Sequence, residues 1–495
     1  MTGRRSLLVE RFERVCRDRS SSVALHALVE HRTVTFADLW REYEACWRAI
    51  GALGLPPGSA ILSLAGNRVA FVPCLLAARE LGLVPAPVDS VPTGFELERL
   101  LRAFEPSGVV APAGVDVPGM EPGAVLPGGL ALHTRSGGSG EPAFHRAEVL
   151  KLTSGSAGVP KAVACSEANL VADGEHIVDA MGIRPDDVNV AAIPLSHSYG
   201  IGNLVMPLLL QGTAAVLRQS FVPDQFVADV STHAATVFPG VPYMYDHLLQ
   251  RCTGLALPPS LRLLLTAGAR IRFDTVAGFE RAFGLKVHSF YGTSETGGIT
   301  FDDTATIDEA LPVGRPLSGT TVTVRGEGPG PGLVHVRGAA VAAGYVSGGA
   351  EAEPGFVDGG FLTGDLGRFE DGALILTGRV SRFLNVAGRK VDPEEIERVL
   401  LELPEVDTAQ VFGLASEKRG EAIVACLVPA PGFPICLPAI REHCSRRLSP
   451  HKIPRQFVVT DALPVGPRGK VDRRALEALV QSRGQGPDDP HGGAR

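Results

Sequence analysis

Residues 149–161 read Val-Leu-Lys-Leu-Thr-Ser-Gly-Ser-Ala-Gly-Val-Pro-Lys, a short apolar run that leads directly into a loop of hydroxyls and glycines. The run at 149–152 predicts a buried strand. In the loop, glycines allow close backbone approach, amides and hydroxyls donate hydrogen bonds, and a lysine supplies positive charge, as a bound polyphosphate requires. The residues expected to contact phosphate are Thr153, Ser154, Gly155, Ser156, Gly158 and Lys161.

Two well-known functional loops, the Walker A loop and the nucleophile elbow, are each excluded by one residue. Ala162 follows Lys161 where a Walker A loop needs Ser or Thr to hold magnesium, and Ser154 occupies the place of the first glycine of a nucleophile elbow. A surface turn followed by an exposed lysine would have the same composition. The phosphate-binding interpretation therefore depends on what surrounds the loop.

The segments before the loop alternate between helix and strand. Apolar residues recur at helical spacing over 36–50 and 69–81, whereas 59–64 and 84–88 are short apolar runs typical of buried strands. Strands separated by helices of this length predict crossover units and a mainly parallel sheet. Residues 111–142 are rich in glycine and proline, and we expect a loose surface excursion there.

The segments after the loop change in character twice. Beyond Leu311, short alternating runs separated by glycine predict a smaller β-rich subdomain. A final block of about 100 residues has the size of an independent domain. Its expected elements are helices at 393–401 and 437–447 and strands at 408–412, 422–428 and 456–460. The predicted fold class is α/β, a large N-terminal region of several subdomains with parallel-rich sheets plus a β-rich subdomain, followed by a small α+β C-terminal domain.

The composition excludes several function classes. A formal net charge of −7 lacks the basic excess of a general nucleic-acid binder. Eight cysteines stand singly, without zinc-knuckle spacing, which predicts reduced thiols and a cytoplasmic protein. The N-terminus does not read as a signal peptide, and the longest apolar run, 201–217, is interrupted by polar residues and is too short for a membrane span. No pattern indicates an oligomeric state.

Further polar segments follow the loop in a fixed order. They are Pro194-Leu195-Ser196-His197-Ser198-Tyr199-Gly200, Thr266-Ala267-Gly268-Ala269-Arg270, Tyr291-Gly292-Thr293-Ser294-Glu295-Thr296-Gly297-Gly298, Thr363-Gly364-Asp365-Leu366-Gly367, Gly378-Arg379 and Pro464-Val465-Gly466-Pro467-Arg468-Gly469-Lys470. Together with the loop, these segments resemble those of the adenylate-forming superfamily, which includes acyl-CoA synthetases, peptide-synthetase adenylation domains and luciferases.

The resemblance implies an ATP site. In it, the ring of Tyr291 stacks on adenine, the carboxylate of Asp365 accepts both ribose hydroxyls, and Glu295 carries Mg²⁺. Besides the loop, the implied ATP-binding residues are Gly268, Ala269, Tyr291, Gly292, Thr293, Ser294, Asp365 and Arg379.

The resemblance also implies a catalytic cycle with a mobile C-terminal domain. Lys470 would bridge the attacking carboxylate and the α-phosphate, with His197 and Glu295 as the other catalytic residues. The implied hinge residue is Ser381. The expected boundaries are 1–378 for the ATP- and carboxylate-binding region, 379–382 for the hinge, 383–480 for the mobile domain and 481–495 for a disordered tail.

Three positions depart from the superfamily pattern. Ala157 lacks the usual hydroxyl, Ala162 replaces a usual glycine, and Ser381 replaces a usual Asp or Lys. Thr153, Ser154 and the other loop donors remain, and a small hinge residue can absorb a backbone rotation.

The implied function is activation of a carboxylic acid, a small-molecule substrate, by ATP to an acyl-AMP, with pyrophosphate release and transfer to a thiol, foremost coenzyme A. An acyl carrier protein bearing phosphopantetheine, a stand-alone acyl-AMP ligase, a luciferase-like oxygenase and a catalytically inactive nucleotide sensor stay open. An amino-acid activator is disfavoured, because 221–224 read Phe-Val-Pro-Asp where that class has Phe-Asp-x-Ser.

The identity of the acid, fatty or aromatic, does not follow from the motifs. The expected walls of the acyl pocket are His197, Tyr199, Val241, Pro242 and Gly268. Gly268 and its neighbour Ala269 are small and leave room for a bulky ligand, which argues weakly against acetate.

Overall fold

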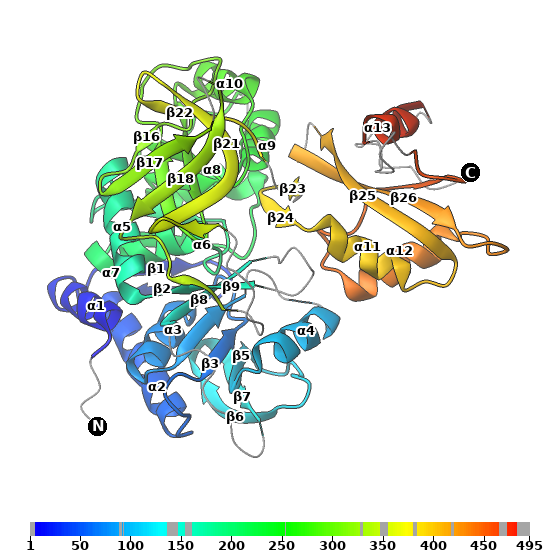
Figure 1. Cartoon of the computed structure of the whole chain (residues 1–495). Helices are drawn as coiled ribbons and strands as arrows, with labels where there is room; N and C mark the ends of the chain where they lie inside the picture. Colours follow the sequence, from blue (N-terminus) through cyan, green and yellow to red (C-terminus); the bar gives the residue numbers. More distant parts are fainter. Residues whose placement is uncertain are drawn as a thin grey trace.

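Five strands between residues 60 and 134, with the helices that pack around them, form an α/β subdomain (Figure 1). The structure is a computed structural model that describes residues 5–88, 92, 94–135, 147–153, 161–252, 254–326, 330–346, 355–379, 384–416, 420–464 and 473–482. The five-stranded sheet of this subdomain has the order β4-β3-β5-β7-β6, and β3 is parallel to both β4 and β5. Its strands are β3 (Ala60–Ser63), β4 (Val84–Pro87), β5 (Gly108–Pro112), β6 (Glu121–Leu126) and β7 (Leu130–Thr134).

The predicted strand–helix–strand units of this subdomain are confirmed, but the predicted surface excursion at 111–142 is wrong for residues 111–135, the part of it that the structure describes. β6 and β7 pair antiparallel within it, and Leu130 and Leu132 of β7 are fully buried. The glycines there form turns: Gly128 and Gly129, between the two strands, have φ values of 71° and 70°. The helices of this part are α1 (Leu7–Asp18), α2 (Phe36–Gly51), α3 (Phe71–Glu80) and α4 (Gly94–Phe104).

A nine-stranded sheet lies at the centre of the large region, with the order β16-β15-β14-β13-β12-β10-β11-β1-β2. Its six inner strands, from β14 to β1, are parallel, and the antiparallel pairs stand at the two edges. The strands are β1 (Val23–Ala27), β2 (Arg32–Thr35), β10 (Val188–Ala191), β11 (Ala214–Leu217), β12 (Val237–Gly240), β13 (Leu263–Thr266), β14 (Val287–Thr293), β15 (Gly297–Phe301) and β16 (Arg315–Pro316).

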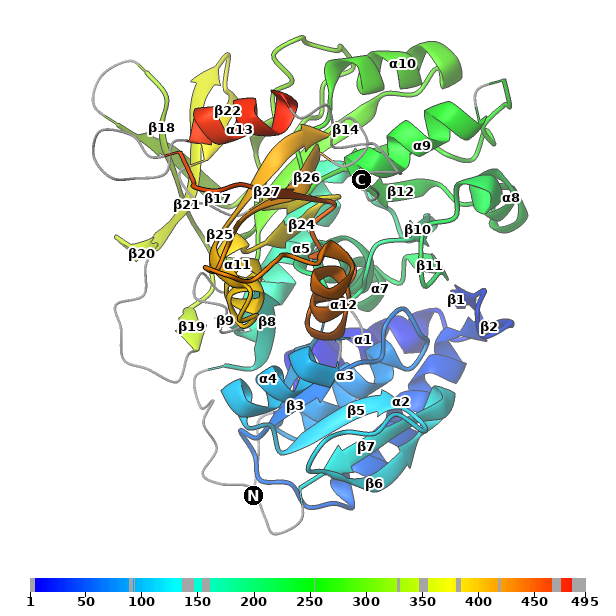
Figure 2. The same ribbon diagram turned by 90° about the vertical axis from the view of Figure 1, so that its right-hand side faces the viewer.

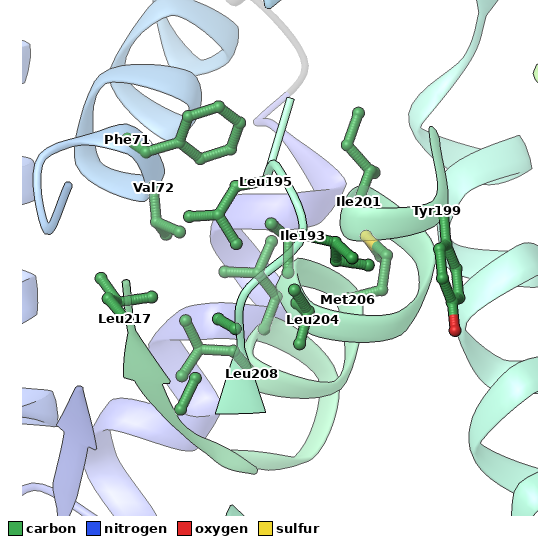
Figure 3. Close-up of a cluster of buried hydrophobic side chains, with 14 of the residues drawn as sticks. Phe71, Val72, Ile193, Leu195, Tyr199, Ile201, Leu204, Met206, Leu208 and Leu217 are labelled. Atoms are coloured by element: carbon green, nitrogen blue, oxygen red, sulfur yellow. The ribbon is translucent and has the colours of Figure 1, made fainter. Parts of the chain in front are cut away.

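Helices connect the parallel strands, as the prediction of a parallel-rich sheet requires. They are α5 (Glu167–Met181), α6 (Ser198–Gly200), α7 (Met206–Gln211), α8 (Pro223–His233), α9 (Pro242–Cys252) and α10 (Phe273–Phe283). Phe71 and Val72 of α3 gather with Ile193, Leu195 and neighbouring apolar side chains in one buried cluster (Figure 3). The two α/β subdomains therefore share a core.

Two smaller sheets complete the N-terminal region. An antiparallel sheet is formed by β8 (Val149–Thr153), β9 (Lys161–Cys165) and β19 (Gly344–Val346), and the loop predicted to bind phosphate connects β8 to β9. The predicted β-rich subdomain is confirmed by an antiparallel sheet, whose strands are β17 (Thr320–Arg325), β18 (Gly332–Gly338), β20 (Phe356–Val357), β21 (Gly360–Glu370) and β22 (Ala373–Arg379).

The last part of the chain has its own α+β fold and lies beside the large region (Figures 1 and 2). Its helices α11 (Pro393–Leu401) and α12 (Leu437–Arg447) have the predicted bounds. Alternate residues of the central strands face two cores, one under α11 and α12 and one under α13 (Arg473–Ser482) on the opposite face. The strands are β23 (Leu384–Val386), β24 (Arg389–Val391), β25 (Val406–Ser416), β26 (Gly420–Pro429) and β27 (Gln456–Val459).

All eight cysteines lie in the described residues, none of them forms a disulfide there, and only Cys436 is exposed. The apolar run 201–217 folds into a helical turn, α7 and the buried strand β11. Among the helices that the structure describes, none is both long enough and apolar enough to cross a bilayer.

Candidate functional site

His197 stands at the start of a helix that follows the end of β10. Its Nδ1 accepts a hydrogen bond from the backbone N–H of Tyr199 at 3.2 Å and so caps α6. The turn is tight at its other end, where a Cβ on Gly200 would lie 2.0 Å from the carbonyl oxygen of Pro194. Only glycine fits there, which explains the glycine of the motif and fixes His197 at the cavity wall.

Ser294, Thr293 and Glu295 lie where β14 turns into β15. The hydroxyl of Ser198 donates to Ser294 Oγ at 2.7 Å, so the histidine segment and the acidic segment meet. Glu295 is largely buried, and its Oε1 accepts a hydrogen bond of 2.7 Å from Tyr345 Oη.

Tyr345 is a site residue that the sequence analysis missed. It lies on β19, opposite Val163 of β9, and the Nζ of Lys161 stands 5.4 Å from the centre of its ring. Tyr345 therefore joins the lysine of the phosphate loop to Glu295. A single tyrosine in a glycine-rich stretch gave no sequence signal, because the pairing of β19 with β9 is what brings it to the site.

The two residues predicted to hold the nucleoside are in contact. Tyr291 Oη donates a hydrogen bond of 2.6 Å to Asp365 Oδ2, and both side chains are largely buried. Arg379 stands opposite Asp365 in the β21–β22 register, so its backbone position is next to the carboxylate. The side chain of Arg379 lies outside what the structure describes.

These segments surround one cavity of about 1060 Å³. The predicted residues that line it are Lys161, His197, Tyr199, Gly268, Ala269, Tyr291, Gly292, Thr293, Ser294, Glu295 and Asp365. Val241 and Pro242 are not among the lining residues, and the side chain of Val241 faces Gly388 instead. Ser154, Gly155, Ser156, Gly158, Ser381, Lys470 and the side chain of Thr153 lie outside the described part of the chain.

The β23–β24 hairpin of the C-terminal part also lines the cavity, which the sequence analysis did not predict. Asn385 Nδ2 donates a hydrogen bond to the carbonyl oxygen of Gly268. A Cβ on Gly268 would lie 3.2 Å from the carbonyl oxygen of Gly388, and both glycines have positive φ. The close approach of the two backbones therefore depends on glycine on both sides.

A buried ionic network joins α4 to the C-terminal part next to this hairpin. Lys452 Nζ lies 2.9 Å from Glu96 Oε1 and 3.2 Å from Glu395 Oε2, and Arg99 is paired with Glu395 at 3.0 Å. Ser449 donates to Glu96 through its backbone N–H at 3.1 Å and through its hydroxyl. Burial lowers the pKa of Lys452, but Glu395 and Glu96 offset this effect, so that the pKa is raised and the ammonium stays charged.

His451 lies between this network and the hairpin. Its Nδ1 is 3.2 Å from Arg389, and burial together with Arg389 and Lys452 lowers its pKa to about 3. A neutral histidine at this place can accept a hydrogen bond from Arg389.

The described residues that flank Lys470 lie away from the cavity. Leu463 and Leu476 pack in the core beneath α13, on the face of the C-terminal sheet opposite to α11 and α12. The described residues that line the cavity include none from 453–464 or 473–482.

The site has donors that suit a hard cation. Glu295 and Lys161 both line the cavity and both contact Tyr345, and carboxylate oxygens are ligands that Mg²⁺ prefers. No cluster of three or more His, Cys, Asp or Glu side chains that could hold a metal occurs within the described residues. This donor set fits a cation held by one carboxylate together with phosphate oxygens and water.

Comparison with known families gives two consecutive matches. Residues 12–346 match the family described as AMP-binding enzyme, and residues 395–470 match the AMP-binding enzyme C-terminal domain.

Individual relatives align over nearly the whole chain. The sequence is 30% identical over 469 residues to sulfoacetate–CoA ligase of Cupriavidus necator, an alignment that covers 90% of this chain and 92% of that ligase. It is 26% identical over 466 residues to oxalate–CoA ligase of Arabidopsis thaliana, with 87% and 90% covered. Among solved structures, the amide bond synthetase McbA from Marinactinospora thermotolerans superimposes with a TM-score of 0.80 at 25% identity, over 94% of this chain and 99% of that chain.

Proposed function

Because this chain belongs to the AMP-binding enzyme family, we propose that it is an acid–thiol ligase that activates a carboxylic acid with ATP and transfers the acyl group to coenzyme A. The observation that carries this proposal is the single cavity shared by Lys161, His197, Glu295 and the Tyr291–Asp365 pair. These groups match the needs of a nucleoside triphosphate and an attacking acid.

In the first half-reaction, the carboxylate oxygen of the acid attacks the α-phosphorus of ATP, and pyrophosphate leaves with the electrons of the broken P–O bond. Tyr291 and Asp365 hold the nucleoside, and Lys161 together with the loop donors binds the phosphates. Lys470, delivered by the C-terminal domain, stabilises the negative charge that develops on the phosphoryl oxygens. His197 marks the mouth of the pocket for the acid.

Glu295 would hold Mg²⁺, which when bound neutralises phosphate charge. Tyr345 donates to one oxygen of Glu295 and thereby orients the carboxylate.

In the second half-reaction, the thiol sulfur of CoA attacks the acyl carbon, and AMP leaves. We infer that the C-terminal domain turns about the 379–382 hinge between the two steps, with Ser381 as the pivot. We assign the domain arrangement of this structure to the second half-reaction. The β23–β24 hairpin supports this assignment, because Asn385 and Gly388 line the cavity whereas the described residues that flank Lys470 do not. The Glu96–Lys452 contacts would hold that arrangement.

Other acceptors form the second candidate function. The structural similarity to an amide bond synthetase favours an amine as an alternative nucleophile for the same acyl-AMP. A phosphopantetheine-bearing carrier protein remains a further acceptor. The presence of eight cysteines without a disulfide in the described structure supports a reducing compartment, and we propose the cytoplasm as the place of reaction.

A pyrophosphate-release screen tests the first step. The purified protein is supplied with ATP, Mg²⁺ and a panel of aryl, short-chain and long-chain acids, and CoA, a carrier protein and simple amines are then compared as acceptors. We expect acid-dependent pyrophosphate release and a thioester with CoA. Absence of release with every acid would leave a nucleotide sensor rather than an enzyme.

The Lys470→Ala variant tests the assignment of the two steps. We expect it to lose acyl-AMP formation and to keep thioester formation from supplied acyl-AMP, because Lys470 is needed only for charge on the transferring phosphoryl group. Equal loss of both half-reactions would contradict the hinge mechanism.

A further inference from the structure

Asn67 lies in the loop between β3 and α3, and its side chain is buried. Its Nδ2 donates hydrogen bonds to the backbone carbonyl oxygens of Ile193 at 2.9 Å, Arg218 at 2.8 Å and Ala191 at 3.3 Å. Its Oδ1 accepts a hydrogen bond of 2.8 Å from the backbone N–H of Leu195. These partners fix the amide orientation, because the reverse orientation would set Oδ1 against carbonyl oxygens. One buried side chain therefore binds four backbone groups that lie outside its own loop.

The four backbone groups lie where β10 and β11 end, which is the side of a parallel sheet at which ligands bind. Ile193 and Leu195 belong to the segment that leaves β10 and leads to His197. Arg218 directly follows β11. Asn67 belongs to the other α/β subdomain, so its hydrogen bonds attach the backbone just before His197 to a different part of the fold.

Apolar packing holds the same segment. Leu195 is buried in one cluster with Phe71 and Val72, which lie in the first turn of α3 (Figure 3). Beyond Leu195 the chain turns, and the backbone N–H of His197 donates to the carbonyl oxygen of Pro194 at 3.2 Å. The place of the imidazole at the cavity wall therefore depends on where the backbone of Leu195 is held.

Asn67 is not among the described residues that line the cavity, so its effect on a reaction must pass through a residue that does. On the basis of the proposed function, in which His197 marks the place of the acid, we propose that Asn67 is a positioning residue for acid activation. It holds the backbone before His197 so that the imidazole stays at the carboxylate of the acid. A displacement of about 1 Å in such a group lowers the rate by on the order of 100-fold. The nucleoside is held by other elements, with Tyr291 on β14 and Asp365 on β21.

Pyrophosphate release with ATP and Mg²⁺ tests the proposal, with cinnamate, butanoate and decanoate as the acids. We expect Asn67→Ala to lower kcat/KM for an accepted acid roughly 10- to 100-fold, and to change the Kd of ATP, measured by calorimetry, by less than about threefold. The double variant with His197→Ala should have the kcat/KM of His197→Ala within about threefold, because the histidine through which Asn67 acts is already gone. Independent effects would multiply instead.

The Asn67→Asp variant provides a rescue through pH. An ionised carboxylate would face carbonyl oxygens, whereas a protonated carboxyl group has one donor and one acceptor site, as the amide does. Burial among carbonyl oxygens raises the pKa of a carboxyl group. The kcat/KM of Asn67→Asp, taken relative to the wild type at each pH, should therefore rise as the pH falls from 8 to 6. The same ratio for Asn67→Ala should stay constant.

Asn189→Ala is the matched control. Asn189 is buried on β10, its side chain makes no hydrogen bond in the described structure, and it is not among the described residues that line the cavity. The same substitution there also removes a buried amide from the strand that leads to His197. This variant should keep kcat/KM for the acid within about threefold of the wild type, whatever its melting temperature.

The position of the His197 ring can also be followed without a substrate. In protein labelled with ¹³C at the histidine rings, the signal of His197 is the one that is missing from His197→Gln. It should move in Asn67→Ala and stay in place in Asn189→Ala.

An unmoved His197 signal in Asn67→Ala would overturn the positioning role. So would multiplied losses in the double variant, or a parallel loss of ATP binding and of kcat/KM for the acid. In each case the ligase function stays intact, and Asn67 serves only to join the two subdomains. No pyrophosphate release by the wild type with any of the acids overturns the proposed function and, with it, the role of Asn67.

Discussion

Replacement of Glu96 by alanine should separate the two half-reactions. Glu96 is buried on α4 and accepts three hydrogen bonds across the interface with the C-terminal part, one from Lys452 at 2.9 Å and two from Ser449. All three exist only while the C-terminal part occupies the present position. The change therefore acts on the equilibrium between domain arrangements.

The expected loss of interface free energy is estimated from the contacts that Lys452 keeps when Glu96 is removed. Removal of one partner of a buried ion pair costs about 3–5 kcal/mol when the other charge is left alone. Lys452 keeps Glu395 at 3.2 Å, and water can enter the opened interface, so we expect about 2 kcal/mol. That free energy lowers the population of the present arrangement roughly 30-fold relative to any other.

The assay measures both steps on the same variant. Thioester formation from supplied acyl-AMP and CoA should slow by about tenfold or more, whereas acid-dependent exchange of pyrophosphate into ATP should change by less than about threefold. A double-mutant cycle with Lys452→Ala should give a coupling free energy of about 1–3 kcal/mol for thioester formation.

Glu98→Ala is the matched control on the same helix. Glu98 is exposed and pairs with Arg102 in solvent, and such pairs contribute little. Equal effects of Glu96→Ala on both half-reactions, or no effect on thioester formation, would refute the assignment of this interface to the second step.

Three further predictions concern the proposed metal site, the core and the pH dependence of stability. Tyr345→Phe removes the 2.7 Å hydrogen bond to Glu295, and kcat/KM for pyrophosphate release should fall about tenfold, with half-saturation at higher Mg²⁺. Glu167→Ala leaves Arg79, 2.8 Å away, buried without its main partner, and should lower the free energy of unfolding by about 3 kcal/mol, seen as a lower melting temperature. Burial, Arg389 and Lys452 lower the pKa of His451 from its ordinary 6.5 to about 3. The unfolded chain therefore binds a proton at this histidine below about pH 6.5, whereas the folded protein does so only near pH 3. The contribution of neutral His451 to the free energy of unfolding is complete above about pH 6.5 and is lost as the pH falls toward 3. His451→Asn should reduce the loss of thermal stability between pH 7 and pH 5, as followed by thermal unfolding; an unchanged pH dependence would contradict the assignment.

The sequence alone was sufficient for the motifs and for most elements. Helices 393–401 and 437–447 were predicted with their bounds because each has a proline in its first turn and carries apolar residues at helical spacing. The excursion predicted at 111–142 was wrong for its described part, because glycine and proline mark turns whether or not strands lie between them. The burial of Leu130 and Leu132 depends on the pairing of β7 with β5 and on packing in the core.

By itself, the sequence determined which chemical groups this protein has and in what order: the phosphate loop, His197, the Tyr291–Glu295 segment and Asp365. Tertiary structure alone decided which other residues join them. Tyr345 reaches Glu295 through strand pairing, and Glu96 meets Lys452 across an interface. Local sequence determines the spacing of apolar residues along each helix or strand and the residue types at turns. Contacts between residues that are far apart in the sequence depend on packing, which no single segment encodes.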